Sequence, residues 1–95
     1  MITRIVKMTF IESYIPNFVE IFDKAKEKIQ NSTGCIDVEL LQDKENKNIF
    51  FTYIHWETEN NLKNYKDSKV FAEVWTKTKS LNLEDAEAWT TTKIN

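Results

Sequence analysis

Hydrophobic and polar side chains alternate over residues 2–10, which predicts a β-strand because successive side chains of a strand point to opposite faces. One face of this strand would carry Ile2, Arg4, Val6, Met8 and Phe10. From residue 15 the spacing changes, and apolar side chains recur every three or four positions as far as Ile29. That period predicts an amphipathic helix over residues 15–29.

The segment after this helix contains the only glycine of the chain, Gly34. Glycine suits the left-handed backbone conformation that commonly closes a helix. Two further stretches, residues 36–41 and 48–57, alternate in the manner of strands and are joined by a short polar link. They predict a β-hairpin, and both faces of its second strand are apolar enough to need covering.

The remainder of the chain predicts a bent helix and a last strand. Thr58 and Ser68 each precede a helical pattern and can act as N-caps, so we expect a helix from residue 59 that bends near Ser68. Residues 85–94 include Trp89 and three consecutive threonines and predict a strand. The resulting order, β-α-β-β-α-β, is the ferredoxin-like α+β fold, with a four-stranded antiparallel sheet and both helices on one face.

The sheet face without helices would carry large apolar side chains, among them Ile49, Phe51 and Tyr53. Leaving such a face in water is unfavourable. We therefore predict a homodimer in which two open sheet faces close against each other as a dimeric α+β barrel. A length of 95 residues predicts a single domain over residues 1–95.

Charge and composition exclude several classes of partner. Thirteen Lys and Arg against fifteen Asp and Glu give a formal net charge of −2, which argues against nucleic acid and anionic membrane surfaces as partners. The sequence contains no run of about 18 apolar residues and no apolar leader, and its single cysteine, Cys35, cannot form an internal disulfide. We expect a soluble cytoplasmic protein without a metal site.

Three short motifs lie at the junctions of the predicted elements. They are Thr33-Gly34-Cys35, Trp56-Glu57-Thr58 and residues 62–71, which read L-x-x-Y-x-x-S-x-x-F. Together they resemble the antibiotic biosynthesis monooxygenase family of small dimeric ferredoxin-like proteins, over nearly the whole chain. The resemblance implies oxidation of a small phenol- or quinol-type aromatic substrate by O2, with no metal or flavin cofactor.

The chain also departs from the pattern of that family. Many members have Glu two residues before the strand-end Trp and His three residues before the Ser, where this chain has Ile54 and Tyr65. In the haem-degrading branch an Asn, a Trp and a His are used, and these correspond to Val6, Tyr65 and Trp75. Haem degradation is disfavoured because the iron would lack a protein ligand. The lost polar groups leave a second interpretation open, a non-catalytic small-molecule binding or sensor module.

An apolar space lined by aromatic side chains is predicted between the helices and the sheet. The predicted substrate-binding residues are Val6, Met8, Ile54, Trp56, Tyr65, Ser68, Phe71 and Trp75. The alternative is that they pack as core, as aromatic stripes at helical spacing more often do. An apolar pocket suits a substrate that supplies the electrons itself, because the protein then has to position and desolvate it.

Candidate catalytic residues are few. Tyr65 can orient a substrate hydroxyl, although a phenol with its ordinary pKa of about 10 is a poor base. His55 is the only side chain whose ordinary pKa lies near neutrality, yet strand alternation places it on the face opposite Trp56, which favours a structural role at the dimer interface. Arg4 and Lys7 are expected to be solvated or to pair across strands.

Overall fold

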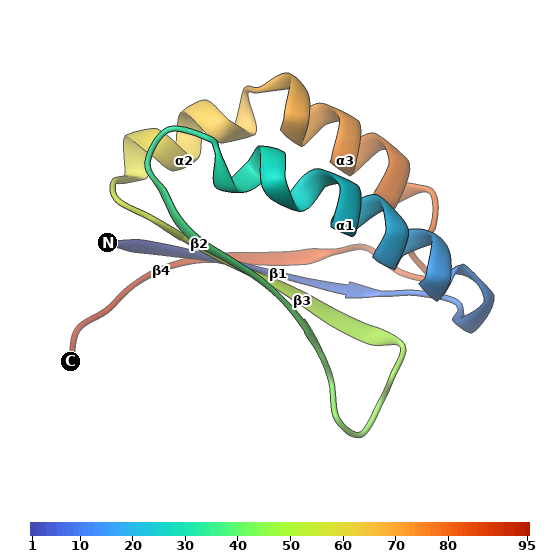
Figure 1. The fold of residues 1–95 in the computed structure, drawn as a ribbon. Coiled ribbons are helices and arrows are strands. Elements are labelled where there is room, and N and C mark those ends of the chain that lie inside the picture. Colours follow the sequence, from blue (N-terminus) through green and yellow to red (C-terminus); the bar gives the residue numbers. More distant parts are fainter.

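The computed structural model describes residues 1–95 and places all of its helices on one side of an antiparallel sheet (Figure 1). The strands are β1 (Ile2–Thr9), β2 (Cys35–Gln42), β3 (Ile49–Trp56) and β4 (Glu87–Thr92). The helices are α1 (Ile15–Gln30), α2 (Glu59–Lys66) and α3 (Lys69–Lys79), and a short 3-10 helix, η1 (Glu12–Tyr14), precedes α1. The predicted β-α-β-β-α-β order is confirmed, with the second helix in two pieces.

The order of strands in the sheet is β2-β3-β1-β4, and the register decides which side chains share a face. Arg4 lies opposite Ile54 of β3 and Thr90 of β4. Ile5 lies opposite Tyr53 and Trp89, on the other face. Because the helices cover the face of Arg4, the side chain of Trp89 belongs to the open face together with those of Ile5 and Tyr53.

Local hydrogen bonds explain where the helices begin and why the second one bends. The Thr58 hydroxyl accepts from the backbone N–H of Asn61 (3.1 Å) and caps α2. The Ser68 hydroxyl accepts from the N–H of Phe71 (3.2 Å) and donates to the carbonyl of Tyr65 (2.6 Å). Ser68 therefore joins the end of α2 to the start of α3, and the predicted bend is confirmed. Gly34 has a φ of +81°, as its position after the helix predicts.

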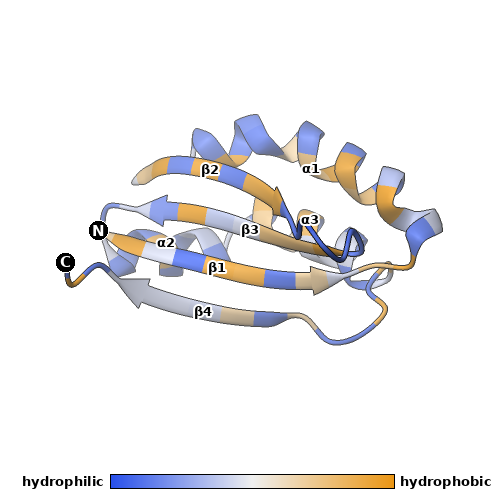
Figure 2. Cartoon of the chain, turned by 90° about the horizontal axis from the view of Figure 1, so that it is seen from below, coloured by the Kyte–Doolittle hydropathy of each residue, from blue (hydrophilic) through white to orange (hydrophobic).

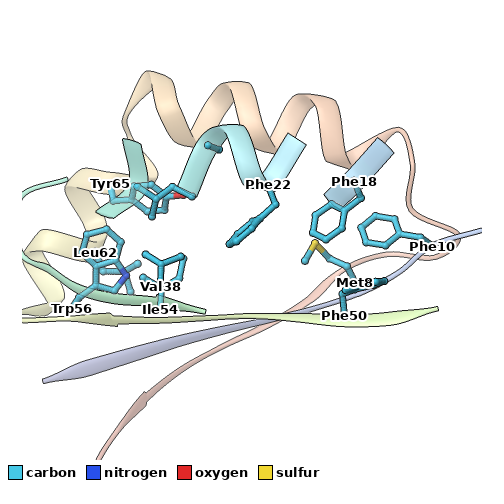
Figure 3. Close-up of a cluster of buried hydrophobic side chains, with 12 residues drawn as sticks. Met8, Phe10, Phe18, Phe22, Val38, Phe50, Ile54, Trp56, Leu62 and Tyr65 are labelled. Carbon is cyan, nitrogen blue, oxygen red and sulfur yellow. The ribbon is translucent and has the colours of Figure 1, made fainter. Parts of the chain in front are cut away.

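The buried core has two aromatic ends beneath the helices (Figure 3). At one end Phe10 stacks on Phe18 with ring centroids 4.3 Å apart. At the other end Trp56 lies beside Tyr65, and Phe22 points down from α1 between the two ends. Burying each such ring contributes roughly 1.5 to 3 kcal/mol, so the two ends hold helices and sheet together.

The open sheet face carries apolar side chains that the chain itself does not cover. Trp89 is 46% exposed and Leu41 is 43% exposed, whereas Ile5, Phe51 and Tyr53 are half-buried. Figure 2, which views the molecule from the side opposite the helices, shows hydrophobic segments along β1 and β3.

None of the helices combines the length and the apolar character that spanning a bilayer would require.

Candidate functional site

A cavity of about 240 Å³ lies between the helices and the sheet. Its lining is mostly apolar and comes from the inner faces of β1, β3 and β4 and from all three α-helices. Six residues predicted for substrate binding lie together here: Val6, Met8, Ile54, Tyr65, Phe71 and Trp75. A dry cavity of about 150 Å³ can accept benzene, so this one has room for a small aromatic molecule.

Two residues predicted for this site do not line the cavity. Trp56 is 0% exposed and lies behind Tyr65, with their ring centroids 4.9 Å apart, so it is part of the core. Ser68 has its hydroxyl engaged in the link between α2 and α3. Strand periodicity placed Trp56 on the inner face of β3, but it could not distinguish a second layer of packing from a cavity wall. Ser68 lies in the link between α2 and α3 and not on the face of a helix.

Tyr65 contributes a phenol ring to the cavity. Its ring meets Phe71 edge to face, with centroids 5.4 Å apart and an interplanar angle of 80°. Burial, and to a lesser degree the negative charge of the Cys35 thiolate, raises the pKa of Tyr65 to about 12. The phenol is therefore protonated at neutral pH, and it can donate a hydrogen bond but cannot act as a base.

His55 lies on the open face of the sheet, away from the cavity, as strand alternation predicts. Its Nδ1 is 2.8 Å from the hydroxyl oxygen of Thr3, and its ring meets that of Tyr53 edge to face at 4.8 Å. His55 consequently cannot reach a molecule held between the helices and the sheet. The two catalytic candidates are on opposite faces.

Four polar residues of the cavity were not among the predicted site residues: Arg4, Thr52, Lys66 and Thr78. Arg4 donates a hydrogen bond from Nη1 to the hydroxyl oxygen of Thr90 (2.8 Å), which agrees with the expected cross-strand pairing. Thr78 is only 2% exposed, and its hydroxyl has no hydrogen-bond partner. Its position was detectable, because Thr78 continues the helical stripe of Phe71, Val74 and Trp75, whereas its unpaired hydroxyl was not.

Other features of the surface are less suited to bind an apolar molecule. A depression of about 290 Å³ between α1 and α3 has several charged side chains, including Glu20, Lys24 and Glu73. No group of three or more His, Cys, Asp and Glu side chains is arranged to hold a metal ion. The Cys35 thiol is half-buried, and its desolvation raises its pKa.

Comparisons with known proteins agree with the fold and with the motifs. The family model described as antibiotic biosynthesis monooxygenase matches residues 1–77. A search of curated proteins finds no match. The following solved structures show the same fold at low sequence identity.

A conserved protein from Methanosarcina mazei Go1 is 22% identical, with a TM-score of 0.92, and the match covers 98% of this chain and 93% of that chain. A candidate antibiotic biosynthesis monooxygenase from Nitrosomonas europaea is 15% identical, with a TM-score of 0.92 and full coverage of both chains. SnoaB, a cofactor-independent oxygenase from Streptomyces nogalater, is 15% identical, with a TM-score of 0.88, and the match covers 99% of this chain and 93% of that chain.

Proposed function

This chain belongs to the antibiotic biosynthesis monooxygenase family, and from that premise we propose that it is a cofactor-independent monooxygenase acting on a small phenol- or quinol-type substrate. The observation that carries the proposal is the cavity of about 240 Å³ between the helices and the sheet, with its mostly apolar lining. The description of SnoaB as a cofactor-independent oxygenase supports the same chemistry on the same fold.

In the proposed reaction the aromatic substrate supplies the electrons. The ionised ring passes one electron to O2, and the resulting radical and superoxide combine to form a carbon–oxygen bond. The peroxide takes a proton from solvent, and the resulting hydroperoxide loses water together with the hydrogen of the attacked carbon, which leaves a carbonyl group. One oxygen atom enters the product and the other leaves as water, and the four electrons required all come from the substrate.

The residues of the cavity would act by excluding water and holding the ring. Side chains such as Val6, Met8 and Trp75 provide apolar walls, and these favour a flat aromatic molecule over water. Confining the ring next to O2 lowers the entropic cost of bringing the two reactants together. The protonated Tyr65 phenol can donate a hydrogen bond to a substrate oxygen.

One observation favours a second function, a non-catalytic binding or sensor module. The cavity lining contains no His, Asp or Glu, and Tyr65 is too weak an acid to serve as a base at neutral pH. A protein that only binds an aromatic ligand needs no such group. In that case ligands would quench tryptophan fluorescence without any consumption of oxygen.

We also propose that the protein is a homodimer closed through its open sheet faces. The apolar side chains of Trp89 and Leu41 on this face support the proposal, because pairing two such faces would remove them from water. The cavity lies on the opposite side of the sheet, so each protomer would keep its own site.

The test of the monooxygenase proposal is oxygen uptake by purified, metal-free protein with a panel of quinols and anthrone-type phenols. Ala88 lines the cavity opposite Val6, so Ala88→Phe should fill the cavity and abolish uptake while the far-ultraviolet circular dichroism stays unchanged. Glu84→Phe adds the same ring at an exposed position outside the cavity and serves as the control. Uptake no faster than in buffer across the whole panel would contradict the enzymatic function.

A further inference from the structure

We propose that the cavity selects an anionic aromatic ligand, whose acidic group lies at Arg4 and Lys66 and whose far end forms a hydrogen bond with the hydroxyl of Thr78. This deepens the proposed function, and it rests on that function only in taking the cavity as the ligand site. Polar groups at both ends of an apolar cavity would fix the direction in which the ligand enters.

The first observation is the sign of the charges around the cavity. Its polar lining residues are Arg4, Thr52, Tyr65, Lys66 and Thr78. Two of these carry a positive charge and none is acidic, although the chain as a whole has a net charge of −2. The two ion pairs of the structure, Lys7–Glu87 and Glu20–Lys24, include neither Arg4 nor Lys66, so both cations are without a carboxylate partner.

The two cations lie at the same end of the cavity. Arg4 is near the start of β1 and is hydrogen-bonded to Thr90 of the neighbouring strand. Lys66 ends α2, and Lys66 and Thr90 line a common surface depression next to the cavity. Glu59 and Lys63 also line this depression, and their charges have opposite signs and offset each other. Neither residue lines the cavity.

The guanidinium of Arg4 is suited to receive an anion. Its bond to Thr90 uses one of the five N–H donors of the group and restrains its position. The remaining donors match the geometry of a carboxylate or a phenolate oxygen. The side chain is half-buried, which reduces screening by solvent, whereas the exposed Lys66 marks the rim through which a ligand would enter.

Thr78 lies at the opposite end. It is close to the end of α3, nine residues after Lys69, which corresponds to roughly 14 Å along the helix axis. Just beyond it, the N–H of Leu83 donates to the carbonyl of Thr9 (2.7 Å), so α3 ends beside the end of β1. Arg4 near the start of β1 and Thr78 near the end of α3 therefore line the cavity from opposite ends of β1.

The hydroxyl of Thr78 is the second, independent observation that points to a ligand. A threonine within a helix usually bonds to a carbonyl of the preceding turn. Here the hydroxyl has no partner although the residue is 2% exposed. A buried hydroxyl without a hydrogen bond is unfavourable, and a polar atom of a bound ligand would satisfy it once the Thr78 side chain turns its oxygen, now closed to solvent, toward the cavity.

The positive charges of Arg4 and Lys66 also account for ionisation of the substrate in a cavity that has no base. No base lines the cavity, yet the proposed reaction begins from an ionised ring. Cations beside a phenol in an apolar environment lower its pKa, because they stabilise the phenolate. The substrate would therefore lose its proton to solvent at the rim as it binds, without a general base on the protein.

Binding of matched ligands to the purified full chain tests the proposal, with titration calorimetry as the measurement. 2-Naphthoate and 2-naphthamide have nearly the same shape and differ in charge, and we expect the anion to bind at least tenfold more tightly at pH 7. Arg4→Met and Lys66→Met should each reduce this preference at least fivefold. Lys63→Met removes the same charge from the same helix outside the cavity and should leave the preference unchanged.

A second pair of ligands tests the far end. 6-Hydroxy-2-naphthoate carries a hydroxyl at the end opposite its carboxylate and should bind more tightly than 2-naphthoate. Thr78→Val has nearly the same volume and should abolish that gain while leaving 2-naphthoate binding unchanged. Circular dichroism spectra and melting temperatures of all variants identify any that fail to fold.

The outcomes separate this proposal from the proposed function. If no naphthalene derivative binds, the cavity is not an aromatic site and the proposed function itself is contradicted. If the acid and the amide bind equally, the aromatic site stands and the anion selectivity is overturned. An equal effect of Lys63→Met and Lys66→Met would also overturn the anion selectivity of the cavity, because the preference for the acid over the amide would then come from the overall charge of the protein.

Discussion

The rings of Trp56 and Tyr65 lie with their centroids 4.9 Å apart, and this contact ties the end of β3 to α2 (Figure 3). Trp56 is fully buried and does not line the cavity, whereas Tyr65 does. The tryptophan therefore supports the wall of the cavity from behind, and its effect on any ligand would pass through the position of Tyr65.

The first prediction concerns stability. Trp56→Ala should lower the free energy of unfolding by about 3 to 5 kcal/mol, because it removes a large buried ring and leaves a hole behind Tyr65. Trp75→Ala should cost clearly less, since that side chain is half-buried and already borders the cavity. Urea unfolding followed by circular dichroism measures both. A loss below about 1 kcal/mol for Trp56→Ala would contradict the assignment of Trp56 to the core.

The second prediction concerns the pH dependence of stability. Tyr65 has a pKa of about 12 in the folded chain, against 10.0 for an ordinary tyrosine. Between these two values the unfolded chain loses the phenol proton and the folded chain keeps it, so rising pH favours unfolding. The stabilisation is fully present below pH 10 and is lost as the pH rises through 12; it amounts to roughly 3 kcal/mol.

Urea titrations at several pH values from 8 to 11 measure this effect. The fall in the free energy of unfolding above pH 10 should be shallower in Tyr65→Phe than in the unaltered chain. Tyr14→Phe removes a phenol that is 40% exposed and lies outside the core, and it serves as the control. Equal slopes in all three proteins would show that Tyr65 ionises as readily in the folded state as in the unfolded state.

The third prediction follows from the unpaired hydroxyl of Thr78. Thr78→Val replaces a buried oxygen without a partner by a methyl group, so the free energy of unfolding without ligand should stay the same or rise by up to about 1 kcal/mol. Thr9→Val provides a comparison at another buried threonine, on the sheet. A substantial loss of stability in Thr78→Val but not in Thr9→Val would mean that the Thr78 hydroxyl has a hydrogen-bond partner in the folded chain, for example an ordered water molecule.

Much of the fold was predictable because the periodicity of the chain is regular and the caps are explicit. The alternation over residues 2–10 separated Val6 from Ile5 correctly, and Ser68 marked the break between α2 and α3. The ends of the elements were less certain: the last strand covers Glu87–Thr92 rather than residues 85–94. Pairing with β1 decides those limits, and pairing is not encoded in the local pattern.

The candidate site was predictable only in part. Periodicity identifies the inner face, so Met8, Phe71 and Trp75 could be assigned to the cavity side. It carries no information about depth, and for that reason Trp56 was placed in the cavity lining. Arg4 was expected to be solvated or to pair across strands; it does pair with Thr90, and the register also places it at the cavity, which its charge did not suggest.

The fourth prediction concerns Gly34, whose left-handed φ of +81° is costly for any residue with a side chain. A methyl group at this position would also overlap the side chain of Asn61. Gly34→Ala should therefore lower the free energy of unfolding by about 2 kcal/mol or more, as measured by urea denaturation. In an Asn61→Gly background, which removes the Cβ as well as the amide group, the loss should shrink to about 1 kcal/mol, the cost of the backbone conformation alone. An equal loss in both backgrounds would contradict the overlap.

The fifth prediction tests the proposed dimer through an edge-strand residue. Trp89 lies on the open face of β4 and is 46% exposed, so Trp89→Glu should leave the fold of one chain intact while placing a charge where two apolar faces would meet. We expect the dissociation constant of the dimer, measured by analytical ultracentrifugation, to rise at least tenfold. Ile11→Glu alters a similarly exposed apolar residue outside the sheet and should have no effect. An unaltered protein that sediments as a monomer at all concentrations would contradict the dimer. Trp89 and its neighbours would then remain in water.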